Sequence, residues 1–383
     1  MTDVPMTART GPKAANASTG EILSGYLSAQ AGAFLRALPQ AVGEAGSRPG
    51  ALPAGGASAA AAAGTEALLR AVRRVGGALH TFAAAFDRDW AAESRTELRW
   101  LLNLLAQEPA LLRRSARLLA ALDSLSETDP GGPGMLAGHM GAPKARALLE
   151  RQLTLARTRA HTTLLQELRS ARLHALADRM TLLASDVPLL DGVAGWPGGA
   201  LPALAAEAFE ALAAEARRLP LSRAATPYGG EGLHRLGAVP PTREPEREPE
   251  PSRDRGSEVD ADSAVAADDA PWHRVRILVK RARYAREVCG APDPDLDLLD
   301  RTLHRHQEAA DAAVTVATAA RTPRITPATA YVLGVVHADQ RLEVEAARYA
   351  FGHQWPNLAT GLAAGWGSLQ SETGGATPAQ RMA

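Results

Sequence analysis

The sequence predicts an all-α protein, and two observations lead to this fold class. First, the 383 residues are 46% hydrophobic but only 4% aromatic, and much of the apolar content is alanine. Together with the many leucines and arginines, alanine favours helix, and runs of the β-branched residues that strands prefer are few. Second, apolar residues recur every three or four positions over long stretches, which is the spacing of one helix face. The length allows one large domain or two of ordinary size.

In the first 220 residues, helices are predicted between segments rich in small or turn-forming residues. Residues 1–19 are rich in Thr, Ala, Gly and Pro and are expected to form a disordered tail. Residues 42–64 lack apolar periodicity and are expected to be a low-complexity insert, and the run ETDPGGPG breaks the pattern again. The periodic stretches are 22–38, 65–86, 94–122, 143–184 (one long helix or two short ones) and 202–219.

An acidic, proline-rich linker is predicted at residues 236–271. Its main part, residues 241–270, holds ten acidic and four basic residues, a composition that buries too little apolar surface to order itself. The linker divides the chain into an N-terminal helical half, residues 20–235, and a shorter C-terminal half, residues 272–360, followed by a second disordered tail at 361–383. The helices of the C-terminal half are expected at 272–288, 296–321 and 327–351.

Several classes of protein do not fit the sequence. The single cysteine, Cys289, excludes an internal disulfide framework and a multi-cysteine metal site. His304 and His306 are two positions apart, so they do not share a helix face, and no metal site is predicted. No phosphate-binding glycine loop and no GxSxG motif occurs, so we expect a non-catalytic protein with no catalytic residues and no cofactor. No stretch fits a transmembrane helix or a secretory signal, which leads us to expect a cytoplasmic location and no membrane partner.

The most informative segment is HRVRILVKRARYAREVC, residues 273–289, with six basic residues and one acidic residue. On a helix, its apolar residues fall on one side and its charged residues on the other. Like charges spaced three or four positions apart repel one another, which favours a bound counter-anion over a merely solvated face. The side chains that fall in or beside the charged stripe are His273, Arg276, Lys280, Arg281, Arg283 and Tyr284.

This segment resembles the signature helix of the CHAD family, the conserved-histidine α-helical domain. The family pattern runs approximately His-x-x-Arg-x-x-x-Lys-Arg-x-Arg-Tyr-x-x-Glu, and the six residues just named, with Glu287, match it. A second family element, Leu-Gly-x-His-Gln-Asp, is similar to residues 303–308, where His306 matches the histidine, His304 replaces the glycine and Glu308 replaces the aspartate. The resemblance extends over roughly residues 20–360.

The resemblance implies two helical-bundle halves around a basic cavity, in which CHAD domains are understood to bind inorganic polyphosphate. It thus implies polyphosphate as the partner of this chain, with association with polyphosphate granules as a possible consequence for its location. His306 joins the signature residues as an implied ligand. Nucleic acid is not expected as a partner, because the basic helix carries only one aromatic residue, Tyr284, on which a base would stack.

The N-terminal half carries only a degenerate copy of the signature, in TEALLRAVRRVGGALHTF. Arg73 and Arg74 align with Lys280 and Arg281, but Glu66, Leu69 and Gly76 stand opposite His273, Arg276 and Arg283. Arg172, in SARLHAL, resembles a Ser-x-Arg element of the family. The candidate ligands from this half are therefore Arg73, Arg74 and Arg172. The erosion of this half leaves an alternative open, a CHAD relic that acts as a structural or protein-interaction module.

Overall fold

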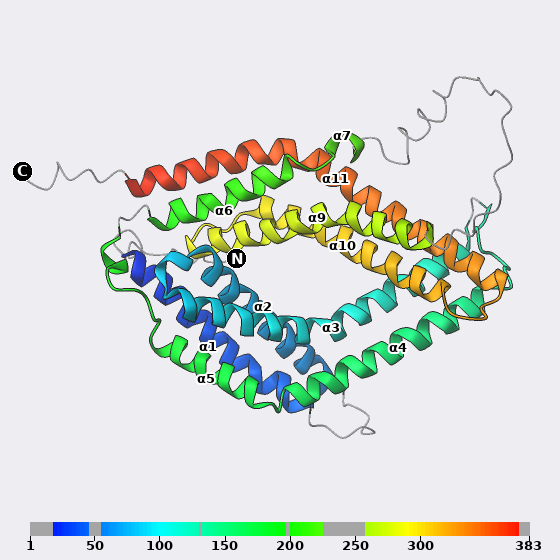
Figure 1. The fold of residues 1–383 in the computed structure, drawn as a ribbon, viewed down its shortest axis with the longest axis horizontal. Coiled ribbons are helices and arrows are strands. Elements are labelled where there is room, and N and C mark those ends of the chain that lie inside the picture. The colour runs from blue at the N-terminus through cyan, green and yellow to red at the C-terminus, as the bar shows by residue number, and fades with distance from the viewer. Residues whose placement is uncertain (1–17, 46–54, 130–131, 197–199, 225–256, 375–383) are drawn as a thin grey trace, which may run out of the picture.

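The computed structural model describes residues 18–45, 55–129, 132–196, 200–224 and 257–374, and it confirms the all-α prediction (Figure 1). One short hairpin, β1 (Thr128–Asp129) with β2 (Gly132–Pro133), interrupts the helices. The α-helices are α1 (Thr19–Ala45), α2 (Gly55–Thr81), α3 (Arg88–Ser126), α4 (Ala142–Glu167), α5 (Ala171–Ser185), α6 (Ala200–Ala216), α7 (Leu221–Ala224), α9 (Ser257–Val288), α10 (Pro294–Ala320) and α11 (Pro327–Gly374).

The helices form two groups that face each other across the middle of the molecule (Figure 1). One group contains α1, α2, α5 and the beginning of α3, and the other contains α6, α9, α10 and α11. α6 precedes the predicted linker in sequence, yet it packs on α9 and α11. The boundary between the groups therefore lies before α6 and not at residue 235, because α6 buries Leu212 and Phe209 in the core that it shares with Trp366.

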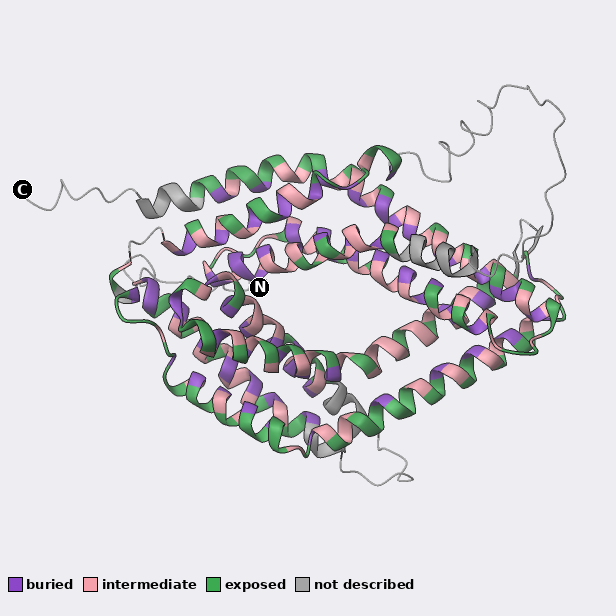
Figure 2. Ribbon diagram, viewed as in Figure 1, coloured by how far each residue is buried: buried purple, intermediate pink, exposed green. Residues whose placement is uncertain are grey.

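Two large apolar cores and a small cluster of Ala309, Ala310 and Val344 hold the described helices together. Figure 2 shows the buried residues in purple. The larger core joins α1 and α2 to α9 and α11, with Phe34, Val72, Val279 and Phe351 among its fully buried members. The second core joins the end of α3 and the beginning of α4 to the end of α10 and the beginning of α11. α3 thus runs from one group to the other, and this long helix forms a wall of the space between them.

Capping residues explain where several helices begin. The side chain of Asp87 accepts a hydrogen bond from the Trp90 backbone N–H at 2.9 Å and starts α3. Ser170 caps α5 in the same way, so residues 143–184 form two helices. Asp293 and the following proline start α10. These are the residue types that satisfy the free N–H groups of a first helical turn.

Three segments that composition marked as irregular are partly helical. α1 extends to Ala45 and α2 begins at Gly55, so residues 46–54 of the predicted insert lie outside the described residues and most of the rest is helix. The insert is helical because alanine, its main residue, has the highest helix propensity. Packing also contributes, since Gly64 lies so close to α1 that a Cβ at this position would fall 2.8 Å from Cβ of Gln40. α11 likewise continues to Gly374, because Leu362 and Trp366 are buried in the larger core.

The predicted linker is the third segment. Residues 225–256 lie outside the described residues, but α9 begins at Ser257 and takes in the last fifteen residues that composition assigned to the linker. Asp268 and Asp269 on this part of α9 form ion pairs with Arg348 of α11. Residues 1–17 of the predicted tail 1–19 and residues 375–383 of the predicted tail 361–383 also lie outside the described residues. Among the helices that the structure describes, none is both long and apolar enough to cross a bilayer.

Candidate anion-binding cavity

A cavity of about 560 Å³ lies between the two helix groups, and α2, α3, α9 and α10 line it. We call it the central cavity. Its walls carry nine basic residues but only two acidic ones, Glu308 and Asp311, a formal excess of seven positive charges. The basic residues are Arg73 on α2, Arg95, Arg99, Arg113, Arg114 and Arg117 on α3, and Arg276, Lys280 and Arg281 on α9.

The signature helix α9 turns Arg276, Lys280, Arg281 and Tyr284 toward the central cavity. Val275, Val279 and Ala282 on its opposite face are fully buried, so packing fixes the rotation of the helix. Burial lowers the pKa of Lys280, and the carboxylate of Asp300, 3.1 Å from Nζ, offsets part of that effect. Burial also lowers the pKa of Arg276, whose Nε is buried without a hydrogen-bond partner in the described structure.

A cluster of three arginines and one histidine lies where α2, α3 and α9 meet. We call Arg95, Arg99, Arg281 and His80 the open cluster. Burial and the positive charges of Arg95 and Arg99 lower the pKa of Arg281. Burial, followed by the charges of Arg281, Arg95 and Arg99, lowers the pKa of His80 to about 4. The imidazole is therefore neutral at pH 7, and its Nδ1 accepts a hydrogen bond from Arg95 Nη1 at 3.0 Å.

At the other end of the central cavity, arginines of α3 are paired with acidic side chains of α10 and α11. Nε of Arg113 donates to Glu308 at 2.8 Å, and Nη2 of Arg114 donates to Asp311 at 3.0 Å. Arg117 donates to Gln340, and its Nη2 lies 3.4 Å from Glu343. We call Arg113, Arg114 and Arg117 the paired cluster, because each of them already has an acidic partner.

His304 bridges two of the charged walls. Its Nδ1 accepts from Nη2 of Arg276 at 3.2 Å, and its Nε2 lies 3.1 Å from a carboxylate oxygen of Glu308. A guanidinium only donates, so Nδ1 is unprotonated and Nε2–H donates to Glu308. Burial lowers the pKa of His304, which fits the neutral form. Within the described ranges, no set of three or more His, Cys, Asp or Glu side chains surrounds a common metal position.

The structure places two predicted ligands, His273 and His306, behind the cavity wall. His306 is 1% exposed, stacks on Trp272 and accepts a hydrogen bond from Nε of Arg348 at 3.2 Å. Burial lowers its pKa far below the ordinary value. His273 lies edge-on to His306, with ring centroids 5.7 Å apart, and its Nε2 is buried. These imidazoles support the wall and do not line it.

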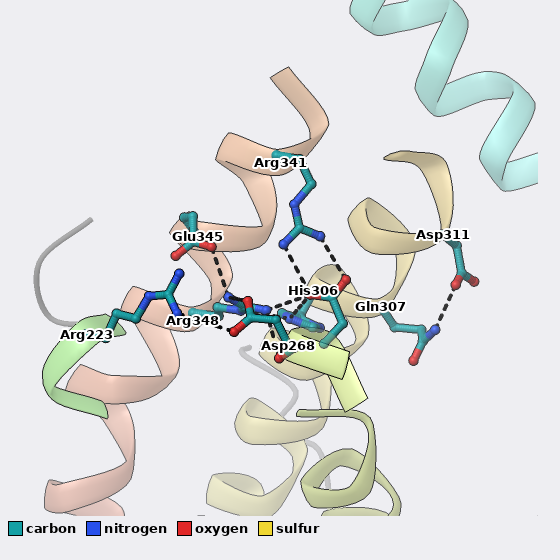
Figure 3. A network of polar contacts seen from close by, with 9 residues as sticks. Arg223, Asp268, His306, Gln307, Asp311, Arg341, Glu345 and Arg348 are labelled. Atoms are coloured by element: carbon teal, nitrogen blue, oxygen red, sulfur yellow. Dashed lines mark hydrogen bonds and ion pairs between the residues drawn. The ribbon is translucent and has the colours of Figure 1, made fainter. Parts of the chain in front are cut away.

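Arg348 is the centre of the buried network that holds His306 (Figure 3). It contacts Asp269 at 2.6 Å, Asp268 at 2.6 Å and Glu345 at 3.0 Å, and Arg341 also bonds to Asp269 at 2.8 Å. Asp269 is 3% exposed. The acidic residues of the predicted linker therefore neutralise buried arginines of α11.

Three further predicted ligands also have partners outside the central cavity. Arg283 bonds to Asp297 at 2.6 Å and Asp300 at 2.9 Å on α10. Arg74 pairs with Glu287 at 2.7 Å, which joins the degenerate signature of α2 to the signature helix. Arg172 pairs with Glu97 at 2.6 Å, and its guanidinium lies 4.2 Å above the ring of Trp100.

The sequence interpretation missed the arginines of α3. They fall at positions 95, 99, 113, 114 and 117, which lie along one side of a helix, with Leu102, Ala106 and Ala110 between them on the same wall. This helical spacing is the sequence feature from which these arginines could have been predicted to share one face. The run AQEPALLRR, residues 106–114, contains two of these arginines, Arg113 and Arg114.

A family model and a solved structure of 41% sequence identity agree with this architecture. The CHAD domain family model matches residues 57–298, which is more than half of the chain. Among solved structures, PptA from Streptomyces chartreusis is 41% identical, with a TM-score of 0.67, over 89% of this chain and 100% of that chain. The CHAD domain from the plant Ricinus communis is 18% identical, with a TM-score of 0.48, over 91% of this chain and 97% of that chain. A search of curated proteins gives no match. On the strength of its matched sequence, the chain belongs to the CHAD domain family.

Proposed function

We propose that this protein binds inorganic polyphosphate in the central cavity and does not act on it chemically. The observation that carries this proposal is the gathering of nine basic side chains from three helices around one cavity that holds two carboxylates. Such an excess of like charge inside a folded protein raises its free energy, and a bound polyanion relieves the repulsion.

The chemistry of the walls suits phosphate groups. Arginine presents a planar fork of N–H donors that binds two oxygens of one phosphate, and lysine adds a compact point charge. Arg73, Arg99 and Arg281 have no hydrogen-bond or ion-pair partner in the part of the chain that the structure describes, so their donors face the cavity unoccupied. The small residues Gly76, Ala106 and Ala110 leave the space between the cations open.

The shape of the site favours a linear chain over a single phosphate group. Arg95 and Arg113 lie eighteen positions apart on α3, which corresponds to about 27 Å along the helix axis at 1.5 Å per residue. A ligand that contacts both ends needs several phosphates in a row. Base stacking is not supported, because Tyr284 is 8% exposed and its ring lies against Gly77.

The carboxylates of the cavity also have defined partners. Glu308 binds Arg113 and His304, and Asp311 binds Arg114 and Gln307. In these pairs they act as counter-ions of the walls, which supports binding and not hydrolysis as the function. A cytoplasmic location, with recruitment to polyphosphate granules, follows from this proposal.

A titration tests the proposal. The full chain is titrated with polyphosphate of defined length by calorimetry, with pyrophosphate and duplex DNA as competitors and at several salt concentrations. We expect tight binding of long chains, weak competition by the other anions, and an affinity that falls as salt rises, because cations are released from the ligand. The variant Arg274→Ala serves as a control and should bind polyphosphate as the unmodified protein does, since Arg274 pairs with Glu215 outside the cavity at 2.8 Å.

Three results would contradict the proposal. Equal competition by DNA would indicate a general basic surface, and absence of binding would favour the alternative of a structural or protein-interaction module. Polyphosphate incubated with the protein should also keep its length on a gel. Progressive shortening would show catalysis in place of simple binding.

A further inference from the structure

The basic residues of the central cavity differ in what already neutralises them. No carboxylate contributes to the lowered pKa of Arg281 or His80 in the open cluster, where burial and neighbouring arginines account for it. In the paired cluster, Arg113 and Arg114 donate to Glu308 and Asp311. Among the described residues, the same cavity therefore has one end without a counter-ion and one end with carboxylate counter-ions.

The two clusters are also separated along α3. Arg99 belongs to the open cluster and Arg113 to the paired cluster, fourteen positions further on, or about 21 Å along the helix. A short anion that binds at Arg99 does not reach Arg113. A long anion passes Lys280 and Arg276, whose side chains line the wall between the clusters, and then meets Glu308 and Asp311.

We propose that Glu308 and Asp311 set the length selectivity of the central cavity. A short polyphosphate occupies the open cluster alone, whereas a long chain must displace these two carboxylates from Arg113 and Arg114 to gain the paired cluster. This inference rests on the proposed function, because it assumes that polyphosphate is the ligand of the cavity.

The physical argument is an exchange of anions. When a phosphate replaces Glu308 at Arg113, the guanidinium keeps its charge-assisted hydrogen bonds, so that contact is gained at little cost. The displaced carboxylate, however, stays beside a bound polyanion in a site that excludes part of the solvent, and the two negative charges repel. The second partner of Glu308, Nε2 of His304, also retains the carboxylate close to its present position.

A pair of neutral variants isolates this effect. Glu308→Gln and Asp311→Asn keep the size of the side chains and remove their charge. We expect each to raise the affinity for long-chain polyphosphate by about tenfold or more, the effect of removing one close charge repulsion, and the affinity for tripolyphosphate by less. The measured quantity is the ratio of long-chain to tripolyphosphate affinity in the full chain, determined by calorimetry.

Glu97→Gln is the matched control. It removes one negative charge, as the two variants do, but Glu97 lies on α3 and pairs with Arg172 away from the cavity. Its affinity ratio should equal that of the unmodified protein. Arg99→Gln should weaken the binding of both ligands, since both use the open cluster. Thermal melts of every variant identify any loss of folding.

The outcomes separate the inference from the function on which it rests. If neither Glu308→Gln nor Asp311→Asn raises the affinity ratio, or if Glu97→Gln raises it as much, the two carboxylates do not set length selectivity. If the unmodified protein binds neither tripolyphosphate nor long-chain polyphosphate, the proposed function itself is wrong.

Discussion

Gly77 of α2 lies directly against Tyr284 of α9, so closely that a Cβ at position 77 would fall 2.9 Å from Cδ2 and 3.2 Å from Cβ of the tyrosine. This contact joins the degenerate signature of the N-terminal half to the signature helix of the C-terminal half. A Cβ at the neighbouring Gly76 would meet no atom within 4 Å. Both glycines lie on the cavity wall, but only Gly77 is also packed against the tyrosine.

We expect Gly77→Ala to destabilise the protein and Gly76→Ala to stabilise it. The alanine at 77 forces Tyr284 and its helix to move, which costs about 1–3 kcal/mol as overpacking does elsewhere. The alanine at 76 gains helix propensity of up to about 1 kcal/mol without a clash. Melting temperatures of the two variants check the prediction. A melting temperature for Gly77→Ala at or above that of Gly76→Ala would show that α2 and α9 are not in close contact.

Arg281 and Arg172 provide a second test, because both are arginines that the sequence marked as candidate ligands. Arg281 lines the cavity and has no carboxylate partner among the residues that the structure places, whereas Arg172 pairs with Glu97 outside the cavity. Arg281→Ala should lower polyphosphate affinity about 10- to 100-fold, the value of one charge-assisted contact of about 1.5–3 kcal/mol. Arg172→Ala should leave affinity unchanged and lower stability by no more than about 1 kcal/mol. Similar affinities of the two variants in calorimetric titrations would place the ligand elsewhere.

The neutral histidines predict a pH dependence of stability. The folded-state pKa of His80 is about 4, below its ordinary value of 6.5, and those of His304 and His306 are also lowered, with burial as the largest cause in each case. In this range the unfolded chain binds more protons than the folded protein, so stability should fall as the pH falls from 6.5 to about 4. Thermal melts across this range check the direction.

The variant His80→Gln assigns part of this pH dependence to the cavity. Its melting temperature should fall less steeply than that of the unmodified protein between pH 6.5 and about 4, because one titrating group is gone. Polyphosphate should reduce the fall in the unmodified protein, since an anion beside His80 favours its protonated form. Parallel curves for the two proteins without ligand would mean that His80 titrates normally.

The rotation of α9 was predictable from sequence, because it depends on local periodicity. Apolar residues at positions 275, 279 and 282 pack inward, and Arg276 and Lys280 consequently face the cavity. Arg283 belongs to the same charged stripe, but it turns to Asp297 and Asp300. That pairing depends on how α10 packs against α9, and the sequence pattern of α9 alone does not predict this packing.

The arginines of α3 also show that a binding site formed by tertiary contacts cannot be identified from the pattern of one helix. Their helical spacing is visible in the sequence, but an arginine stripe becomes a binding wall only if it faces other cations across a cavity. Arg99 meets Arg281 because α3 crosses between the two helix groups. Leu69, opposite Arg276 in the repeat, is 6% exposed and belongs to the larger core, so it does not act as a ligand. Arg73 of the same degenerate copy lines the cavity, and α3 adds five further arginines.

At Asp268 and Asp269, the average composition of the predicted linker gives a wrong prediction of disorder. Across residues 241–270 the charge is strongly negative, and such a segment alone does not fold. Asp269 nevertheless bonds to Arg348 and Arg341 of α11, about eighty and seventy positions further on. Only the tertiary contacts show that Asp268 and Asp269 belong to the folded part of the chain.

We therefore expect Asp269→Ala to destabilise the protein much more than Asp268→Ala. Asp269 is 3% exposed, and its loss leaves the buried guanidinium of Arg348, also 3% exposed, without its best-shielded partner. Breaking a buried ion pair from one side costs about 3–5 kcal/mol. The side chain of Asp268 is 30% exposed, so water replaces it in part, and we expect a cost nearer 1 kcal/mol. Urea unfolding followed by circular dichroism measures both. Equal and small effects would show that the start of α9 is not anchored to α11, and that the acidic segment is a spacer as its composition suggested.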